Sequence, residues 1–196
     1  MDKPIMDISH HQTVTDWTKT AGAVEAAYIK ATEGQGYMDP KFREFTQAAQ
    51  SHGIPKGFYH YASLNDTANP ATDARAEARG FLKATAPYTK ELPYALDIET
   101  NKSGLDRGQV VQWIAAFFDE LEQNGVKDYV IYSYTPFLDD NLPKDHPFGK
   151  IRLWLAAYTE TPKLPKGWAA YWLWQYTDRG SVPGIAGKVD LSRKPS

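Results

Sequence analysis

Short apolar strand patterns alternate with helical patterns along this chain at intervals of about 30 residues, and this alternation restricts the fold more than any other feature. The predicted strands are Pro4–Ser9, Ala26–Ala31, Gly57–Ala62, Tyr94–Glu99, Tyr129–Tyr134, Arg152–Tyr158, Tyr171–Tyr176 and Lys188–Leu191. The predicted helices lie around Val14–Thr20 and at Lys41–Ser51, Thr72–Ala86, Arg107–Asn124 and Pro136–Leu142. Such an alternation is typical of right-handed βαβ units, which build a parallel sheet.

Eight strand candidates favour a sheet that closes on itself. A regular barrel of eight strand–helix units usually needs about 250 residues, whereas this chain has 196, and its last three strands leave no room for full helices between them. The sequence therefore predicts an α/β fold, an irregular, compressed (β/α) TIM-like barrel with about eight strands and fewer helices. An open, doubly wound sheet is the alternative. No internal repeat or linker divides the chain, so we expect a single domain over residues 1–196.

Composition and charge exclude several kinds of partner. The net charge of −2 gives no support to nucleic acid or an anionic membrane. The absence of cysteine excludes disulfides and thiolate metal sites. No stretch approaches the roughly 20 apolar residues of a membrane span, and the first residues lack the basic region and apolar core of a signal peptide. We therefore expect no nucleic-acid or membrane partner and no signal peptide in this chain.

The predicted strand Tyr94–Glu99 ends in two acids that share one face. Side chains alternate along a strand, so Asp97 and Glu99 point to the same side. Each carboxylate raises the cost of ionising the other, which raises a pKa. A carboxylic acid beside an ionised carboxylate is typical of enzymes that cleave glycosidic bonds. The alternative is a structural role, in which the two acids cap a helix or pair with Lys or Arg.

Two further acids are predicted to join this pair. Catalytic residues of a parallel barrel lie at the C-terminal ends of its strands, and Asp7 lies near the end of the first strand. In a closed barrel the last strand pairs with the first, which brings Asp190 beside Asp7. Four acids from three distant segments would then line one opening. Aromatic side chains on the strands surround them, some for packing and some as platforms for a sugar ring, namely Tyr28, Tyr59, Tyr61, Tyr132, Trp154, Tyr158, Trp174 and Tyr176.

Seven motifs follow one another along the whole chain. They are PIMDISHHQ (4–12) with Asp16 and Trp17, YIKATEG (28–34) with YMDP (37–40) and Phe42, GFYHY (57–61), LDIE (96–99), WLAAY (154–158), WQYT (174–177), and VPGI (182–185) with Gly187 and VDL (189–191). Together they resemble glycoside hydrolase family 25, the Chalaropsis-type lysozymes. Two positions depart from the family pattern, Thr13 where Gly is common and Ser192 where Asn is frequent, and we expect them to affect local loop shape rather than activity.

The resemblance implies an irregular β/α barrel and a muramidase, which cuts the β-1,4 bond between N-acetylmuramic acid and N-acetylglucosamine in bacterial peptidoglycan. It makes Glu99 the general acid and Asp97 the residue that orients the 2-acetamido group of the substrate or stabilises the oxocarbenium-like centre. It also implies that Asp7 and Asp190 bind sugar and hold the carboxylate network. The expected substrate-binding residues are Tyr59, Tyr61, Glu33, Tyr132, Trp154, Tyr158, Trp174 and Gln175.

The resemblance also sets expectations for the surroundings of the enzyme. The partner would be a glycan strand of peptidoglycan, reached outside the cell or after release from a host cell by a phage. We expect a monomer without a cofactor and without a wall-binding domain in this chain. His10, His11 and His60 lack the spacing of a metal motif, so we expect no metal either.

The spacing of the two acids bears on the mechanism. Two residues apart on one strand, their Cα atoms lie about 6.5–7 Å apart. A carboxylate nucleophile attacks the sugar from the face opposite the general acid, and two neighbouring acids on one strand are poorly placed for this. A general acid beside an acid that orients the substrate instead fits substrate assistance, in which the configuration is retained. A chitinase-like barrel glycosidase and a glycan-binding module without activity remain the alternatives.

Overall fold

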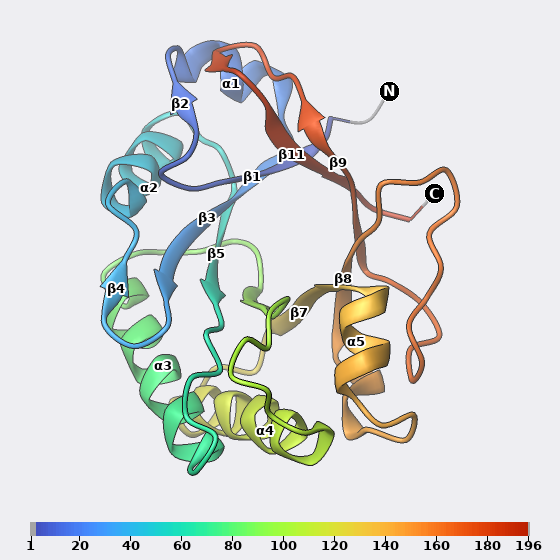
Figure 1. The fold of residues 1–196 in the computed structure, drawn as a ribbon. Coiled ribbons are helices and arrows are strands. Elements are labelled where there is room, and N and C mark those ends of the chain that lie inside the picture. The colour runs from blue at the N-terminus through green and yellow to red at the C-terminus, as the bar shows by residue number, and fades with distance from the viewer. Residues whose placement is uncertain (1–2, 196) are drawn as a thin grey trace.

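Eight strands close into a barrel in the computed structural model, which describes residues 3–195 (Figure 1). The barrel strands are β1 (Ile5–Ile8), β3 (Ala26–Glu33), β5 (Lys56–Tyr61), β6 (Tyr94–Asp97), β7 (Tyr129–Tyr134), β8 (Arg152–Ala156), β9 (Leu173–Gly180) and β11 (Val189–Arg193). They pair in this order, and β1 closes the ring because it pairs with both β3 and β11. The predicted barrel is confirmed, and the open doubly wound sheet is wrong. The ends of the predicted domain, residues 1–2 and 196, lie outside the described residues.

The last strand of the barrel runs against the other seven. Strands β1 to β9 of the ring are parallel neighbours, but β11 is antiparallel to both β9 and β1. The prediction of a parallel sheet is therefore wrong at this strand. A parallel connection needs a crossover of a dozen or more residues, and only residues 181–188 separate β9 from β11. The reversed strand begins at the rim where the other strands end.

Five α-helices flank the barrel within residues 3–195, fewer than the eight of a regular barrel of this type. They are α1 (Trp17–Ala23), α2 (Phe42–Ser51), α3 (Pro70–Thr85), α4 (Arg107–Gln123) and α5 (Thr135–Asn141), followed by a 3₁₀ turn at Pro147–Lys150. The clearest sequence signal is at α4, which begins with a capping box formed by Asp106 and Gln109. No helix in the described part of the chain is long and apolar enough to cross a membrane.

Three short strands were not predicted. β2 (Thr13–Val14) pairs with β10 (Ile185–Ala186), and β4 (Tyr37–Met38) extends the edge of β3. Two residues are too few to show an alternating pattern in the sequence. The predicted strand Tyr94–Glu99 also ends earlier than expected, at Asp97, so that Glu99 lies in the following loop.

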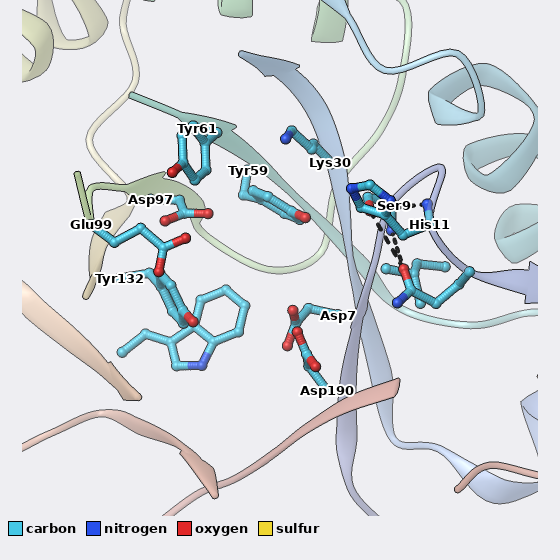
Figure 2. A pocket seen from close by; sticks show the side chains of 13 residues that line it. Asp7, Ser9, His11, Lys30, Tyr59, Tyr61, Asp97, Glu99, Tyr132 and Asp190 are labelled. Carbon is cyan, nitrogen blue, oxygen red and sulfur yellow. Dashed lines mark hydrogen bonds between the residues drawn. The ribbon is translucent and has the colours of Figure 1, made fainter. Parts of the chain in front are cut away.

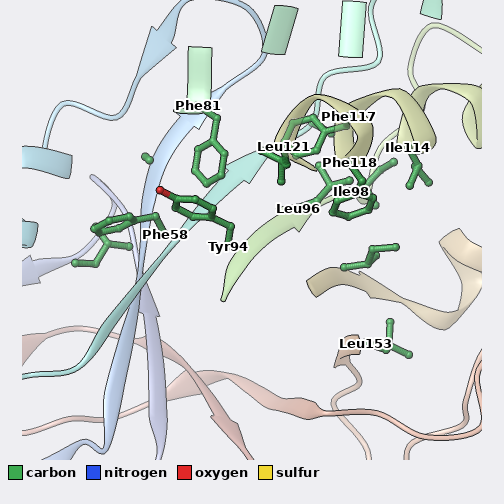
Figure 3. Close-up of a cluster of buried hydrophobic side chains, with 14 of the residues drawn as sticks. Phe58, Phe81, Tyr94, Leu96, Ile98, Ile114, Phe117, Phe118, Leu121 and Leu153 are labelled. Carbon is green, nitrogen blue, oxygen red and sulfur yellow. The ribbon is translucent and has the colours of Figure 1, made fainter. Parts of the chain in front are cut away.

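The alternation of side chains divides the apolar residues of the strands between two cores. Outward residues such as Phe58 and Leu96 meet Phe81 of α3 and Phe117 of α4 in the larger core (Figure 3). Inward residues fill the barrel towards the beginnings of the parallel strands, and they include Ile5, Ala26, Tyr28, Ala95, Val130, Trp154 and Leu173. Burying each large apolar side chain stabilises the fold by roughly 1.5–3 kcal/mol. Because this end is filled, only the opposite rim of the barrel is left for a site.

Candidate active site

A pocket of about 230 Å³ opens at the rim where the parallel strands end (Figure 2). Its lining residues are Asp7, Ile8, Ser9, His11, Gln12, Lys30, Tyr59, Tyr61, Asp97, Glu99, Tyr132, Trp154 and Asp190. The four predicted catalytic acids all belong to this set. The structure therefore brings together acids from three distant segments of the chain.

Asp7 and Asp190 form one pair of acids. Asp7 follows Ile5 on the inward face of β1, and Asp190 is its direct partner in the register of β1 with β11. This is the neighbour relation that the sequence predicted. Figure 2 shows the two carboxyl groups side by side. Because β11 is reversed, Asp190 reaches the rim from the beginning of its strand rather than from the end.

Burial favours the protonated form in the Asp7–Asp190 pair. Burial raises the pKa of Asp7 well above its usual range, and the negative charge of Asp190 raises it further. Burial also raises the pKa of Asp190, although a hydrogen bond with Asp7 lowers it. Asp7 therefore has the more strongly raised pKa of the two. On its other side Asp7 is fixed by the amide of Gln175, which donates to Asp7 Oδ2 at 2.9 Å.

Asp97 and Glu99 form the second pair. Asp97 takes the inward position at the end of β6, next to the inward Ala95. Glu99 lies beyond the strand, where its backbone carbonyl accepts a hydrogen bond from the Tyr134 hydroxyl at 3.0 Å. The preceding carbonyl, that of Ile98, accepts from the Ser133 hydroxyl at 2.6 Å. These bonds to β7 hold the loop, so Glu99 has a defined place although it lies outside a strand.

In this second pair both acids have a raised pKa, and one buried acceptor has no partner. Burial raises the pKa of both Asp97 and Glu99, and the charge of Glu99 adds to the effect on Asp97. The positive charge of Lys30 opposes these shifts. Asp97 Oδ1 is buried and has no hydrogen-bond partner among the described residues. Such an orphaned acceptor costs about 1–3 kcal/mol, so it is a natural place for a ligand N–H or O–H.

Lys30 is a lining residue for which the sequence analysis proposed no role. It is inward on β3 and almost fully buried, its Nζ donates to Glu33 Oε2 at 2.7 Å, and it lies 4.8 Å from the centre of the Tyr61 ring. A lysine in the middle of an apolar strand, two residues after Tyr28, was the signal in the sequence. Ser9, His11 and Gln12 were also not proposed, although they directly follow β1 at the rim.

Aromatic residues form much of the remaining wall. Tyr59, Tyr61, Tyr132 and Trp154 line the pocket as the sequence predicted for substrate-binding residues. Trp154 stacks on Tyr28 with ring centres 4.4 Å apart and meets Tyr132 edge-on at 4.8 Å. The stacked Tyr28 and the edge-on Tyr132 together hold the Trp154 ring in place.

Ser192, one of the two departures from the family pattern, supports this wall. The Trp154 indole donates to Ser192 Oγ at 2.9 Å. The expectation that Ser192 affects loop shape is wrong, because Ser192 lies on β11, is fully buried and holds a pocket residue. Thr13, the other departure, lies on the short strand β2.

Gln175 and Tyr158 lie beside the pocket. Gln175 is buried, and its Oε1 accepts from the hydroxyls of Tyr132 at 2.9 Å and Tyr158 at 2.8 Å, which leaves its amide to donate to Asp7. The two hydroxyl donors therefore determine the orientation of the Gln175 amide. Tyr158 is exposed and lines an adjoining pocket together with Glu99.

Besides Gln175 and Tyr158, two more predicted substrate-binding residues, Trp174 and Glu33, do not line the pocket. Trp174 is outward on β9, one position from the inward Gln175, and its indole donates to the Ala157 carbonyl at 2.7 Å. Glu33 ends β3 after a register shift, and its carboxylate pairs with Lys30 rather than lining the pocket. For Glu33 the reason is the register shift, because a shift of one residue on a strand turns a side chain to the other face. For Trp174 the aromatic pattern of the sequence alone did not show whether the side chain points into the barrel or away from it.

A closed barrel with paired acids and aromatic side chains at its open rim is an arrangement that glycoside hydrolases use. Comparison with known proteins gives the family. The model of the Glycosyl hydrolases family 25 matches residues 6–185. This chain belongs to that family.

Relatives and solved structures agree with the family match. The chain is 36% identical over 172 residues to the autolytic lysozyme of Clostridium acetobutylicum, a match that covers 86% of this chain and 48% of the relative. It is 32% identical over 205 residues to lysozyme M1 of Streptomyces globisporus, covering 96% and 66%. The crystal structure of the bacterial lysozyme from Streptomyces coelicolor superposes with a TM-score of 0.87 at 29% identity, covering 100% of this chain and 93% of that one. The chain thus spans about half to two thirds of the two curated relatives.

Proposed function

We propose that this chain is a lysozyme that hydrolyses the β-1,4 bond between N-acetylmuramic acid and N-acetylglucosamine in bacterial peptidoglycan. The observation that carries the proposal is the pairing, in one pocket, of a carboxyl group whose pKa is raised by burial, Glu99, with a buried, unpartnered acceptor, Asp97 Oδ1. The names of the two curated relatives, both lysozymes, support the same substrate. The place of action is the bacterial cell wall, and the partner is a glycan strand that the chain meets as a monomer.

In the first step, we assign proton donation to Glu99. Its carboxyl proton passes to the glycosidic oxygen while the bond from that oxygen to the anomeric carbon breaks. The carbonyl oxygen of the 2-acetamido group on the same sugar attacks the anomeric carbon and forms a cyclic oxazolinium ion. Asp97 accepts the acetamido N–H at Oδ1, which orients the carbonyl oxygen towards the carbon and stabilises the positive charge that develops on the nitrogen.

In the second step, Glu99 acts as a base. It takes a proton from water, and the water oxygen attacks the anomeric carbon from the face that the leaving group vacated. The bond to the acetamido oxygen breaks, the acetamido group is restored and the configuration is retained after two inversions. Asp7 and Asp190 bind sugar hydroxyls, and burial together with the charge of Asp190 raises the pKa of Glu99, which favours its protonated form.

The bond that is cut can be read from the products. Purified cell walls are digested with the protein, the new reducing ends are reduced with borohydride, and the fragments are identified by mass spectrometry. We expect muramitol at the new ends. Glucosaminitol or cut peptides would contradict the proposal, and release of products from chitin instead of cell walls would favour a chitinase-like enzyme.

Two experiments test the assigned roles. Glu99→Gln keeps the shape of the side chain but removes its proton, and we expect turnover to fall by at least about 10²-fold, the low end for a general acid. Near-normal turnover would place the acid elsewhere. A substrate whose muramic sugar lacks the 2-acetamido group tests substrate assistance, since undiminished turnover of that substrate would rule it out. Proton NMR of the first product anomer shows whether the configuration is retained.

A further inference from the structure

A second cavity lies on the outer side of the barrel, apart from the four acids. This side pocket of about 510 Å³ is bounded by the end of β3, the short strand β4 and the helices α2 and α3 (Figure 1). It shares no lining residue with the pocket at the rim. Its volume is within the range of about 300–1,000 Å³ that small-ligand sites have. The side pocket is therefore large enough for a ligand that the acids do not contact.

We propose that the side pocket binds the peptide attached to the lactyl group of the muramic sugar, through the free carboxylates and the alanine side chains of that peptide. The proposal rests on the proposed function, because it takes the substrate to be peptidoglycan whose muramic sugar reacts at the rim. It adds that the enzyme binds a second part of this substrate on a separate face of the barrel.

The charges of the side pocket favour an anionic ligand. Arg43 and Lys83 are exposed and line it, whereas no Asp or Glu belongs to its lining. Neither cation has an ion pair with an acid within residues 3–195. Lys83 lies in the last turn of α3, where the helix dipole stabilises a cation, but Arg43 lies in the first turn of α2, where the dipole disfavours one. An anion bound beside Arg43 would offset this cost.

The wall of the side pocket contains a glycine where packing does not require one. Gly80 lies in the interior of α3, where glycine is less favourable than alanine. A Cβ atom at this position would meet nothing within 4 Å beyond the backbone of its own helix, so no neighbouring residue excludes a larger side chain. Glycine also lets a ligand approach the backbone closely. We therefore assign the open space at Gly80 to the ligand.

The side pocket also offers apolar surface to a ligand. Tyr37 and Met38 of β4 are two of the three exposed large hydrophobic residues in the described part of the chain, and both line this pocket. With the two cations they suit a peptide that carries both alanine methyl groups and free carboxylates. A wall polymer of glycerol phosphate matches the charges but offers little apolar surface to Tyr37 and Met38.

A peptide attached at the rim can reach the side pocket. Lys30 of β3 lines the pocket with the acids, and Thr32, two residues further on, lines the side pocket. Thr32 points outward, since its Oγ1 lies 2.8 Å from Nδ1 of His60, which stacks on Phe117. Two residues on a strand span about 7 Å, whereas an extended peptide of four residues spans roughly 13–14 Å. Such a peptide is long enough to cross the hairpin of β3 and β4.

Binding of the peptide alone tests the inference without catalysis. The probe is N-acetylated L-alanyl-γ-D-glutamyl-L-lysyl-D-alanine, which has two free carboxylates, and an NMR titration of the isotope-labelled protein measures its Kd. We expect Arg43→Gln and Lys83→Gln each to weaken binding about 2–5-fold, the range that an exposed ion pair corresponds to. Amidation of both carboxylates should weaken binding as well. Lys127→Gln removes an exposed lysine that lines neither pocket and serves as the matched control.

Gly80→Leu tests the side pocket during turnover, because the new side chain occupies the open space. Leucine is a better helix former than glycine, so this variant should unfold at a higher temperature than the wild type. Two tetrasaccharides of alternating N-acetylglucosamine and N-acetylmuramic acid are compared, one with tetrapeptides on its muramic residues and one without. We expect kcat/KM to fall at least about 3-fold on the first and to stay unchanged on the second. The matched control is Gly22→Leu, at another open helical glycine that lines neither pocket.

Three outcomes would overturn the inference. One is a free peptide whose binding is absent, or is not weakened by Arg43→Gln or Lys83→Gln. Another is an equal fall, or no fall, of kcat/KM on the two tetrasaccharides in Gly80→Leu. The third is tighter binding of polyglycerol phosphate than of the peptide, which would assign the side pocket to a phosphate polymer. The proposed function fails separately, if the wild-type protein releases no product from either tetrasaccharide, and the inference then fails with it.

Discussion

Replacing Asp97 with Asn should make the protein more stable at neutral pH and less active. Asp97 is buried, its Oδ1 has no partner among the described residues, and Glu99 follows two positions later. Asn has nearly the same shape but no charge. The substitution therefore removes the electrostatic cost of the site and leaves the packing of β6 in place.

The magnitude follows from the spacing of the two acids. Two ionised carboxylates with a separation on the order of that Cα spacing, about 7 Å, would repel each other by roughly 2 kcal/mol at an effective dielectric constant of about 20, which sets the scale of the cost of ionising both or of keeping one protonated at pH 7. Lys30 attracts Asp97, but it also pairs with Glu33 at 2.7 Å, and Glu99 has the larger effect on the pKa of Asp97. We therefore expect a gain of about 2 kcal/mol in the free energy of unfolding at pH 7, which raises Tm by roughly 4–8 °C for a domain of this size.

The gain should depend on pH in a defined direction. Burial and Glu99 raise the pKa of Asp97 in the folded state, so between its unfolded and folded pKa values the folded state binds more protons. Wild-type stability then falls as pH rises through that window, which begins near pH 4. Asn does not titrate. The two proteins should therefore unfold at similar temperatures below pH 4 and diverge above it.

Calorimetry from pH 3 to pH 8 measures this divergence. The matched control is Asp16→Asn, which removes an exposed carboxylate whose pKa is lowered by hydrogen bonds from Lys19, so no gain is expected from it at pH 7. An Asp97→Asn variant that is less stable than the wild type at pH 7, or whose gain does not change with pH, would refute the reasoning. So would full activity on cell walls, because Asn cannot act as the charged orienter.

Three other substitutions test parts of the site and of its support. Gln175→Leu removes three hydrogen bonds of about 1 kcal/mol each, so the free energy of unfolding measured in urea should fall by about 3 kcal/mol. An unchanged urea midpoint would contradict a stabilising role of these three bonds. Lys30→Met removes the charge that lowers the pKa of Glu99, so the basic limb of the pH profile of kcat should move to higher pH rather than stay or move down. Glu77→Gln weakens the fully buried contact of Glu77 Oε2 with His60 Nε2 at 2.7 Å. We expect it to lower the free energy of unfolding, measured in urea, by about 1.5–3 kcal/mol. A negligible change would show that this contact is unimportant for stability.

The barrel and its acids were predictable because their sequence signals are local or follow from closure. Alternation of apolar residues identifies a strand, and a helical period such as that of Arg107–Asn124 identifies a helix. Closure of the ring pairs the first strand with the last, and this placed Asp190 beside Asp7. That neighbour relation depends only on the order of the strands in the ring.

Other features depend on interactions that the local pattern does not contain. The reversed direction of β11 follows from a connection of residues 181–188, whose length limits the topology without showing which way the strand runs. The choice between Trp174 and Gln175 as the inward residue depends on a register with neighbouring strands, since both types occur inside barrels and outside them. Lys30 was visible in a buried strand, but its effect on two distant carboxyl groups appears only when β3 and β6 lie in one ring.

The fold also explains why four acids in one small pocket need not share one role. Asp7 and Asp190 lie on adjacent antiparallel strands, and burial raises the pKa of both, which favours a lower charge on that pair. Gln175 neutralises no charge, but it fixes the orientation of Asp7. Lys30 instead lowers the pKa of Asp97 and Glu99, so the second pair can hold one negative charge beside one proton at lower cost. In the proposed mechanism, proton transfer therefore lies on the side of Lys30, and the binding of sugar hydroxyls on the side of β11.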